Sequence, residues 1–235
     1  MGTAELNEPA AAWDREYAEI RAYTTSYRGD LDRGVHFLLD WLAARGETLD
    51  GPIVDCGCGM GRNAIPLARR GHEVIGLEHS AAALGRLQAA LAGESLAGSL
   101  TTHRHDLNEP LPVATGSAAA VLDITAVDNL VDAVRRRRYG DEVARILRPR
   151  GTAVVVTFVR DDGYYGRWLE GSPWRREGVV EDPHTGIRNQ LFTPAQLDAV
   201  FVPALRRAAA AKLVFADEAA GEEWTRRFLI HLYMK

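Results

Sequence analysis

The stretch Asp55-Cys56-Gly57-Cys58-Gly59-Met60-Gly61-Arg62-Asn63 decides how this chain folds. It follows the apolar run Pro52–Cys56, which is typical of a buried strand, and it opens the segment Arg62–Arg70, which is typical of an amphipathic helix. Glycines in such a turn let the backbone approach a ligand closely, and the first N–H groups of the following helix have no partner within it. The sequence therefore predicts a ligand site where this strand meets this helix.

Strands and helices continue to alternate after the loop. Buried strands are expected at 74–77, before His105, at 119–124, at 152–158, and near 211–216 and 227–233. The intervening segments 80–91 and 128–147 have helical periodicity, and Thr193-Pro194 is typical of a helix start. Because apolar strands alternate with crossover helices, the sequence predicts a doubly wound α/β sheet.

Two segments stand outside this alternation. Trp13–Arg45 carries apolar residues at helical spacing on both sides of a break near Gly29, which predicts an N-terminal helical cap over residues 1–48. The remaining residues, 49–235, form the predicted ligand-binding domain. Within it, Asp161–Asn189 has no strand-like run and is rich in Gly, Trp, Tyr and charged residues, so we expect a lid over residues 160–190.

The composition excludes several classes of protein. The 235 residues are 46% hydrophobic and 26% charged, as in an ordinary soluble globular protein. A net charge of −4 gives no global attraction to nucleic acid, and the run Arg135–Arg138 is interpreted as a solvated helix face. The apolar runs are far shorter than the roughly 20 residues of a membrane helix, and Met1–Ala12 does not resemble a secretory signal. We therefore expect a cytoplasmic protein that binds neither nucleic acid nor membranes.

The sequence lacks the characteristic residues of three nucleotide-binding classes. The only lysines are Lys212 and Lys235, so the chain has no Walker A loop. A nicotinamide fingerprint starting at Gly57 would place its third glycine at position 62, which is arginine. The Tyr-x-x-x-Lys pair of short-chain dehydrogenases is missing, because the residues four positions before the lysines are Ala208 and His231.

The glycine loop resembles motif I of the class I S-adenosylmethionine (SAM) dependent methyltransferases, Asp-x-Gly-x-Gly-x-Gly. The resemblance runs on from Asn63 through Gly71 to Glu78-His79-Ser80 and covers residues 50 to 160. It is strongest to the tellurite-resistance-like and thiopurine-methyltransferase-like branch, in which Gly-Arg-Asn follows the loop. The resemblance implies SAM as co-substrate without a metal. It also implies a Rossmann-like, mostly parallel sheet of seven strands whose last strand is antiparallel.

The same resemblance implies a set of cofactor contacts. Glu78 ends the next strand, where the family keeps an acidic side chain that accepts hydrogen bonds from both ribose hydroxyls. Asp106 looks like the acceptor for the adenine amino group, and Leu107 looks like the residue that packs on the adenine ring. The full set of expected cofactor contacts is Tyr17, Tyr27, Asp55, Gly57, Cys58, Gly59, Arg62, Asn63, Glu78, His79, Asp106, Leu107 and Asp123.

Three functions stay open after this resemblance. The first is methyl transfer from SAM to a small molecule in specialised metabolism, which needs mainly an in-line approach and no dedicated base. The second is ring closure of SAM itself to azetidine-2-carboxylate, with release of methylthioadenosine. The third is a SAM-binding module without catalysis. We expect methyl transfer ahead of ring closure, in a chain that is a monomer or a homodimer.

Five residues are candidates for the chemistry. Asn129, Tyr164, Tyr165 and Thr193 resemble, in order and local context, the constellation of azetidine-2-carboxylate synthases of the methyltransferase fold. Asp123 opens Asp123-Ile124-Thr125, which resembles motif IV and would face the methionine part of SAM. One tyrosine ring of the pair is expected to meet the sulfonium, because a cation within about 6 Å of a ring is attracted by its quadrupole.

The remaining motifs indicate no further chemistry. The chain lacks the Asn/Asp-Pro-Pro-Tyr string of DNA methyltransferases, which favours a small-molecule substrate or SAM alone. Cys56 and Cys58 are interpreted as small buried residues that fit the turn, rather than as redox groups or metal ligands. The seven histidines are dispersed, and His184 in the lid is the one to test as a base.

Overall fold

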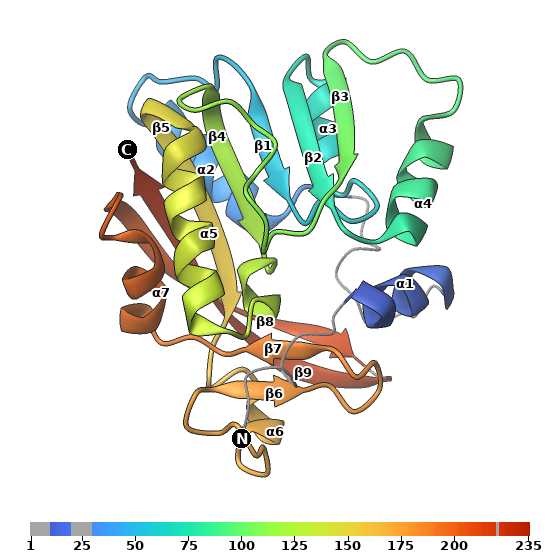
Figure 1. Cartoon of the computed structure of the whole chain (residues 1–235), viewed down its shortest axis with the longest axis vertical. Helices are drawn as coiled ribbons and strands as arrows, with labels where there is room; N and C mark the ends of the chain where they lie inside the picture. Colours follow the sequence, from blue (N-terminus) through green and yellow to red (C-terminus); the bar gives the residue numbers. More distant parts are fainter. Residues whose placement is uncertain (1–9, 20–29, 220) are drawn as a thin grey trace.

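The computed structural model describes residues 10–19, 30–219 and 221–235. Its centre is a seven-stranded sheet with the order β3-β2-β1-β4-β5-β9-β8 (Figure 1). The strands are β1 (Ile53–Cys56), β2 (Glu73–Glu78), β3 (Ser99–Arg104), β4 (Ala118–Ile124), β5 (Leu147–Phe158), β8 (Arg206–Ala219) and β9 (Glu222–Met234). No helix in this described part is long and apolar enough to cross a membrane.

The connections between strands set their directions. Strands β1 to β5 pair in parallel, because longer crossover segments return the chain between them. Strand β9 begins three residues after β8 ends, and it pairs antiparallel with both β5 and β8. The expected doubly wound, mostly parallel sheet of seven strands with an antiparallel last strand is therefore confirmed.

Helices cover both faces of this sheet. They are α1 (Ala10–Glu19), α2 (Arg33–Ala43), α3 (Ala64–Arg69), α4 (Ala81–Leu91), η3 (Val127–Asn129, a 3-10 turn), α5 (Ala133–Ile146), α6 (Gly166–Leu169) and α7 (Pro194–Phe201). Alternate residues of β5 join different apolar clusters, since Val155 packs with α5 and α7 whereas Val154 packs with α2 and α3. Strands β4 and β5 are buried along most of their length for this reason.

The N-terminal segment forms two helices with different neighbours. Helix α1 lies against α4 (Figure 1), where Asp14 Oδ1 accepts a 2.7 Å hydrogen bond from Ser80 Oγ. The Arg86 guanidinium donates to the backbone oxygens of Tyr17 and Ala18, at 2.6 and 2.9 Å. Helix α2 instead contributes Val35 and Leu38 to the core of the domain. The boundary at residue 48 stays a prediction, and Tyr27 lies outside the described residues.

The expectation that residues 161–189 contain no strand is wrong. Strands β6 (Val179–Glu181) and β7 (Arg188–Gln190) pair antiparallel below the main sheet in Figure 1. The Asp182 carboxylate forms the turn between them by accepting hydrogen bonds from the N–H groups of His184 and Thr185, at 2.8 and 3.4 Å. Each strand has only three residues, which is too short for a period-of-two pattern to be recognised in the sequence.

One helix contact depends on the absence of a side chain. Helices α5 and α7 approach so closely at Gly140 that a Cβ atom there would lie 2.3 Å from the Val200 backbone oxygen. We expect Gly140→Ala to lower the free energy of unfolding by about 1–3 kcal/mol, because the helices must separate. Gly85→Ala is the matched control on α4, where nothing lies within 4 Å, and it should be neutral or stabilising by up to about 1 kcal/mol. Urea unfolding of both variants measures this difference, and equal stabilities would contradict the close packing.

Candidate cofactor site

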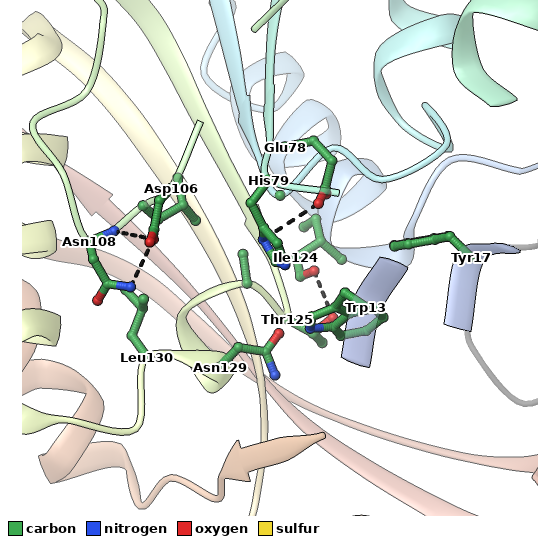
Figure 2. Close-up of a pocket in the computed structure, with 13 residues that line it drawn as sticks. Trp13, Tyr17, Glu78, His79, Asp106, Asn108, Ile124, Thr125, Asn129 and Leu130 are labelled. Carbon is green, nitrogen blue, oxygen red and sulfur yellow. Dashed lines mark hydrogen bonds and ion pairs between the residues drawn. The ribbon is translucent and has the colours of Figure 1, made fainter. Parts of the chain in front are cut away.

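A cavity lies at the carboxyl ends of β1, β2 and β4, the edge at which open α/β sheets bind ligands. Figure 2 shows Trp13 and Tyr17 of α1 on one side of it, and Asp106 and Asn108 on the opposite side. The residues that line it are Trp13, Tyr17, Gly57, Glu78, His79, Asp106, Leu107, Asn108, Ile124, Thr125, Ala126, Asn129 and Leu130. The strand ends and the N-terminal helix α1 therefore build one site together.

The glycine loop has a backbone that other residues adopt only with strain. Gly57 and Gly61 have φ angles of 69° and 87°, in the left-handed region. A Cβ atom on Gly57 would lie 2.9 Å from the Ala126 Cβ, so a side chain here would collide with the segment after β4. The N–H groups of Gly57 and Cys58 both donate to the Leu77 backbone oxygen, at 2.7 and 3.0 Å. The loop is thereby fixed to the end of β2.

The Glu78 carboxylate joins the loop to the end of β2. One oxygen accepts a 2.9 Å hydrogen bond from the Gly59 N–H, and the other accepts a 2.8 Å bond from the Ser80 N–H. The Glu78 residue is only 4% exposed, yet its side chain lines the cavity. An ionised carboxylate has about four acceptor positions, so these two bonds leave capacity for hydroxyl groups of a ligand.

Several polar atoms in the cavity fit a nucleoside. Trp13 Nε1, His79 Nε2 and Asn108 Oδ1 are buried and have no hydrogen-bond partner among the described residues. Buried polar atoms are rarely left in this state, so these three favour a polar ligand that supplies partners. Asp106 Oδ1 accepts hydrogen bonds from the backbone N–H and the side-chain amide of Asn108, at 2.9 and 2.8 Å (Figure 2). These bonds hold the acidic side chain at the rim of the cavity.

Comparisons with known proteins agree with this geometry. Residues 53–151 match the family model described as a methyltransferase domain. Residues 53–151 are therefore similar to a methyltransferase domain. A SAM-dependent methyltransferase of known structure from Methanosarcina mazei has the same fold, with a TM-score of 0.69 and 21% identity, over 88% of this chain and 98% of that one.

Curated relatives of the methyltransferase domain differ in their acceptors. A ubiquinone biosynthesis O-methyltransferase from Cereibacter sphaeroides is 26% identical over 145 residues, which are 62% of this chain and 56% of the relative. A 23S rRNA (uracil(1939)-C(5))-methyltransferase from Pseudomonas aeruginosa is 32% identical over 149 residues, which are 61% of this chain and 30% of the relative. The chain thus spans about half or less of the length of these two relatives.

Asp123 lies behind the cavity rather than in its lining. It is 1% exposed, and its carboxylate accepts hydrogen bonds from the N–H groups of Ala126 and Val127 and a 2.7 Å bond from the Tyr139 hydroxyl. Burial raises its pKa to about 6, against these hydrogen bonds. Ala126 and Val127, which it holds, belong to the segment from Thr125 to Asn129. Asp123 therefore positions the segment that lines the cavity.

Asn129 is the one member of the expected catalytic set that lines the cavity, among the residues the structure describes. Its amide donates to the Arg188 backbone oxygen at 3.1 Å and to Asn189 Oδ1 at 3.0 Å. These bonds connect the segment after β4 to β7. Asn129 therefore lies where β7 meets the cofactor cavity.

Tyr164 and Tyr165 pack around the Arg226 guanidinium, whereas the sequence predicts that one of these rings meets the sulfonium of SAM. The Arg226 guanidinium carbon lies 5.2–5.6 Å from the ring centroids of Phe158, Tyr164, Tyr165 and Phe228. Its Nε also donates to the buried Asp162 carboxylate at 3.0 Å. The rings expected to meet the sulfonium thus pack around Arg226, and neither tyrosine is among the cavity-lining residues.

The loop residues after Gly61 hold the start of α2. Arg62 donates to the Asp30 backbone oxygen and pairs with the Asp32 carboxylate at 3.2 Å. Asn63 Oδ1 accepts a 2.9 Å hydrogen bond from the Asp32 N–H. Both side chains therefore connect the glycine loop to α2, and neither lines the cofactor cavity.

The cysteines, the basic run and His184 also have defined positions. Burial raises the pKa of the Cys56 and Cys58 thiols, which keeps both protonated and unreactive. The Arg136 side chain is half-buried, its partial burial lowers its pKa to about 10, and it donates to the Leu130 backbone oxygen. His184 lies in the β6–β7 turn. No cluster of three or more possible metal ligands occurs within residues 10–19, 30–219 and 221–235.

Residues that the sequence did not single out complete the cavity. Trp13, Asn108 and Leu130 line it. Thr125, the last residue of the string that resembles motif IV, also lines it and has a left-handed φ of 60°. Positive φ at a non-glycine residue cannot be read from the sequence, although Thr125 follows the motif IV aspartate directly. Asp128 is fully buried nearby, and one of its oxygens accepts a 3.4 Å bond from the Phe158 N–H.

Thr193 forms the start of α7 instead of lining the cavity. Its hydroxyl accepts from the Gln196 N–H at 3.3 Å, while its own N–H donates to Gln196 Oε1 at 3.0 Å, which is a complete capping box. We expect Thr193→Ala to lower the free energy of unfolding by about 1 kcal/mol and to leave SAM affinity unchanged, with Thr193→Ser as the control that keeps the cap. Urea unfolding and calorimetric titration measure the two quantities. Weakened SAM binding without a loss of stability would return Thr193 to the cofactor site.

The Asp55 carboxyl makes folding dependent on pH. It is 2% exposed, and burial, together with the Glu78 and Asp123 charges, raises its pKa from 3.8 to about 8. Between these values the unfolded carboxyl ionises while the folded one keeps its proton, so stability falls as pH rises towards 8.

Asp55→Asn removes this titration. We expect the stability of the variant relative to wild type to rise from pH 5 to pH 8, by up to about 1.4 kcal/mol per pH unit. Asp50→Asn, at an exposed position just before β1, is the control for the change in net charge. Urea unfolding at each pH checks this, and a stability difference independent of pH would show that Asp55 is ionised in the fold.

Proposed function

We propose that this chain transfers the methyl group of SAM to a small-molecule acceptor. The observation that carries the proposal is one cavity that combines the Glu78 carboxylate, Asp106 and three unpartnered buried polar atoms beside the glycine loop. In this proposal Glu78 accepts hydrogen bonds from the ribose hydroxyls, while Asp106 and Leu107 bind the adenine. Trp13 and Tyr17 cover the nucleoside from α1.

The residues near Gly57 line the end of the cavity where the sulfonium and methyl group of SAM would lie. Bound SAM supplies an electrophilic methyl group, and its sulfonium is better tolerated beside neutral groups than beside guanidinium ions. Ile124, Thr125, Ala126 and Asn129 line this end, and none of them carries a charge. These side chains exclude water and fix the direction of approach, and proximity of this kind can supply much of the rate enhancement.

Ring closure to azetidine-2-carboxylate is the weaker proposal. It was suggested by Asn129, Tyr164, Tyr165 and Thr193, and of these only Asn129 is among the cavity-lining residues. A small-molecule acceptor is favoured over nucleic acid because Arg136 and Arg137, in the middle of the basic run, donate to backbone oxygens of this chain. The rRNA-modifying relative makes nucleic acid an outcome to be tested.

The test combines SAM binding with product analysis. Because Glu78 would bind the ribose, Glu78→Ala should weaken SAM by about 1.5–3 kcal/mol, which is roughly 10- to 150-fold in Kd. Glu73→Ala, at the exposed start of the same strand, is the matched control and should bind as wild type. Calorimetry measures both, and unchanged affinity in Glu78→Ala would remove Glu78 from the site.

Products then separate the three functions. We expect S-adenosylhomocysteine to form from SAM only when a small-molecule acceptor is added. Methylthioadenosine from SAM alone would instead establish ring closure. Methyl label transferred to rRNA or tRNA would overturn the small-molecule class, and SAM binding without any turnover would favour a binding module.

A further inference from the structure

A second cavity lies directly beyond the end of β4. Its lining is Asp32, Arg33, Arg62, Ile124, Thr125, Val156, Leu213, Phe215 and Phe228. Ile124 and Thr125 line both this cavity and the cofactor cavity. The two cavities therefore share the end of β4 as a common wall, at the neutral end of the cofactor cavity.

One side of the second cavity is aromatic. The rings of Phe215 on β8 and Phe228 on β9 stack with centroids 5.6 Å apart and planes inclined by 11°. Leu213 and Val156 extend this apolar wall. Flat aromatic walls favour planar ligands, because ring faces and edges pack in offset or edge-to-face arrangements.

The other side of the cavity carries an unbalanced positive charge. Asp32 accepts a 2.7 Å hydrogen bond from the Gly34 N–H and pairs with Arg62, so these two side chains largely neutralise each other. The Arg33 guanidinium carbon lies 4.0 Å from the Phe215 ring centroid, and no carboxylate of the described residues forms an ion pair with Arg33. A guanidinium above a ring can still bind a carboxylate through its N–H groups.

Cations also outnumber anions at the mouth of this cavity. Arg33 and Arg62 continue into an outer hollow lined by Asp30, Leu31, His36, Pro66 and Arg70. The two hollows share Arg33 and Arg62, and together they are lined by three arginines and two aspartates, Asp30 and Asp32. An anionic ligand would be attracted towards the Arg33 side as it approaches.

We propose that the second cavity binds the methyl acceptor, and that the acceptor is a planar aromatic acid. This inference rests on the proposed methyl transfer. The ring of the acid packs against the apolar wall formed by Val156, Leu213 and the Phe215–Phe228 pair, Arg33 binds its carboxylate, and its nucleophilic oxygen or nitrogen points to Thr125. That atom forms a bond to the methyl carbon while the carbon–sulfur bond breaks with its electron pair going to sulfur. The proton of the nucleophile passes to water.

The experiment uses the full chain saturated with S-adenosylhomocysteine. The probes are 4-hydroxybenzoate, 3,4-dihydroxybenzoate and 4-aminobenzoate, each paired with its neutral carboxamide, and binding is measured by saturation-transfer NMR and calorimetry. We expect at least one acid to bind ten-fold or more tightly than its amide. Arg33→Leu should abolish this preference and Phe215→Leu should weaken binding of both forms, while SAM affinity changes less than two-fold in each.

Matched controls keep the outcome interpretable. Arg45→Leu removes an arginine that stacks on Trp41 beyond the other end of α2, and it should keep the acid preference. If Arg33→Leu fails to fold, Arg33→Lys replaces it, because loss of the planar fork should still reduce the preference several-fold.

Two results would overturn the acceptor proposal while leaving methyl transfer intact. One is that SAM binds but none of the three acids does. The other is that an acid binds equally well to Arg33→Leu, or competes with S-adenosylhomocysteine for the cofactor cavity. Failure of SAM itself to bind would instead overturn the proposed function.

Discussion

The cofactor cavity depends on the position of the Glu78 carboxylate more than on any other single group. Its two hydrogen bonds, from Gly59 and Ser80, connect the loop after β1 to the first residues after β2. Because β1 and β2 are neighbours in a parallel sheet, their ends meet at one edge, and Glu78 is the buried side chain that fixes their spacing there. Loss of this carboxylate would leave buried N–H groups unsatisfied at the point where the ligand is to bind.

A cluster of acids around Glu78 carries a cost in stability. Burial raises the pKa of Asp55, and the nearby Glu78 and Asp123 charges raise it further, whereas burial alone raises the pKa of Asp123. Burying carboxyl groups together is unfavourable, and proteins concentrate such groups at functional sites. Here the carboxylate of Asp123 has a structural role, because its hydrogen bonds hold the turn that follows β4. This turn contains Thr125 and Asn129, which line the cavity.

The sequence predicts most of the fold, because buried parallel strands and the glycine loop leave strong local patterns. It also places Glu78, Asp106 and Leu107 in one cavity through the order of the family motifs. It misassigns the environment of Tyr164 and Tyr165, since the cation that occupies their rings is Arg226, some sixty residues later on β9. Contacts between distant segments have no local signature, which also explains why Trp13 and the second cavity were not anticipated.

Thr125 connects the two halves of the site. Its left-handed backbone is unusual for a β-branched residue and costs of order 1–3 kcal/mol, so the surroundings must hold it in place. The Thr125 N–H donates to the Val156 backbone oxygen at 2.9 Å, and its hydroxyl donates to the Ile124 oxygen at 2.7 Å. This bend ends β4 abruptly and turns the chain between the two cavities. One of the two non-glycine residues with a left-handed φ in the described part of the chain thus lies where the methyl donor and acceptor of the proposed reaction would meet. A relaxed backbone at Thr125 would move the wall that both cavities share.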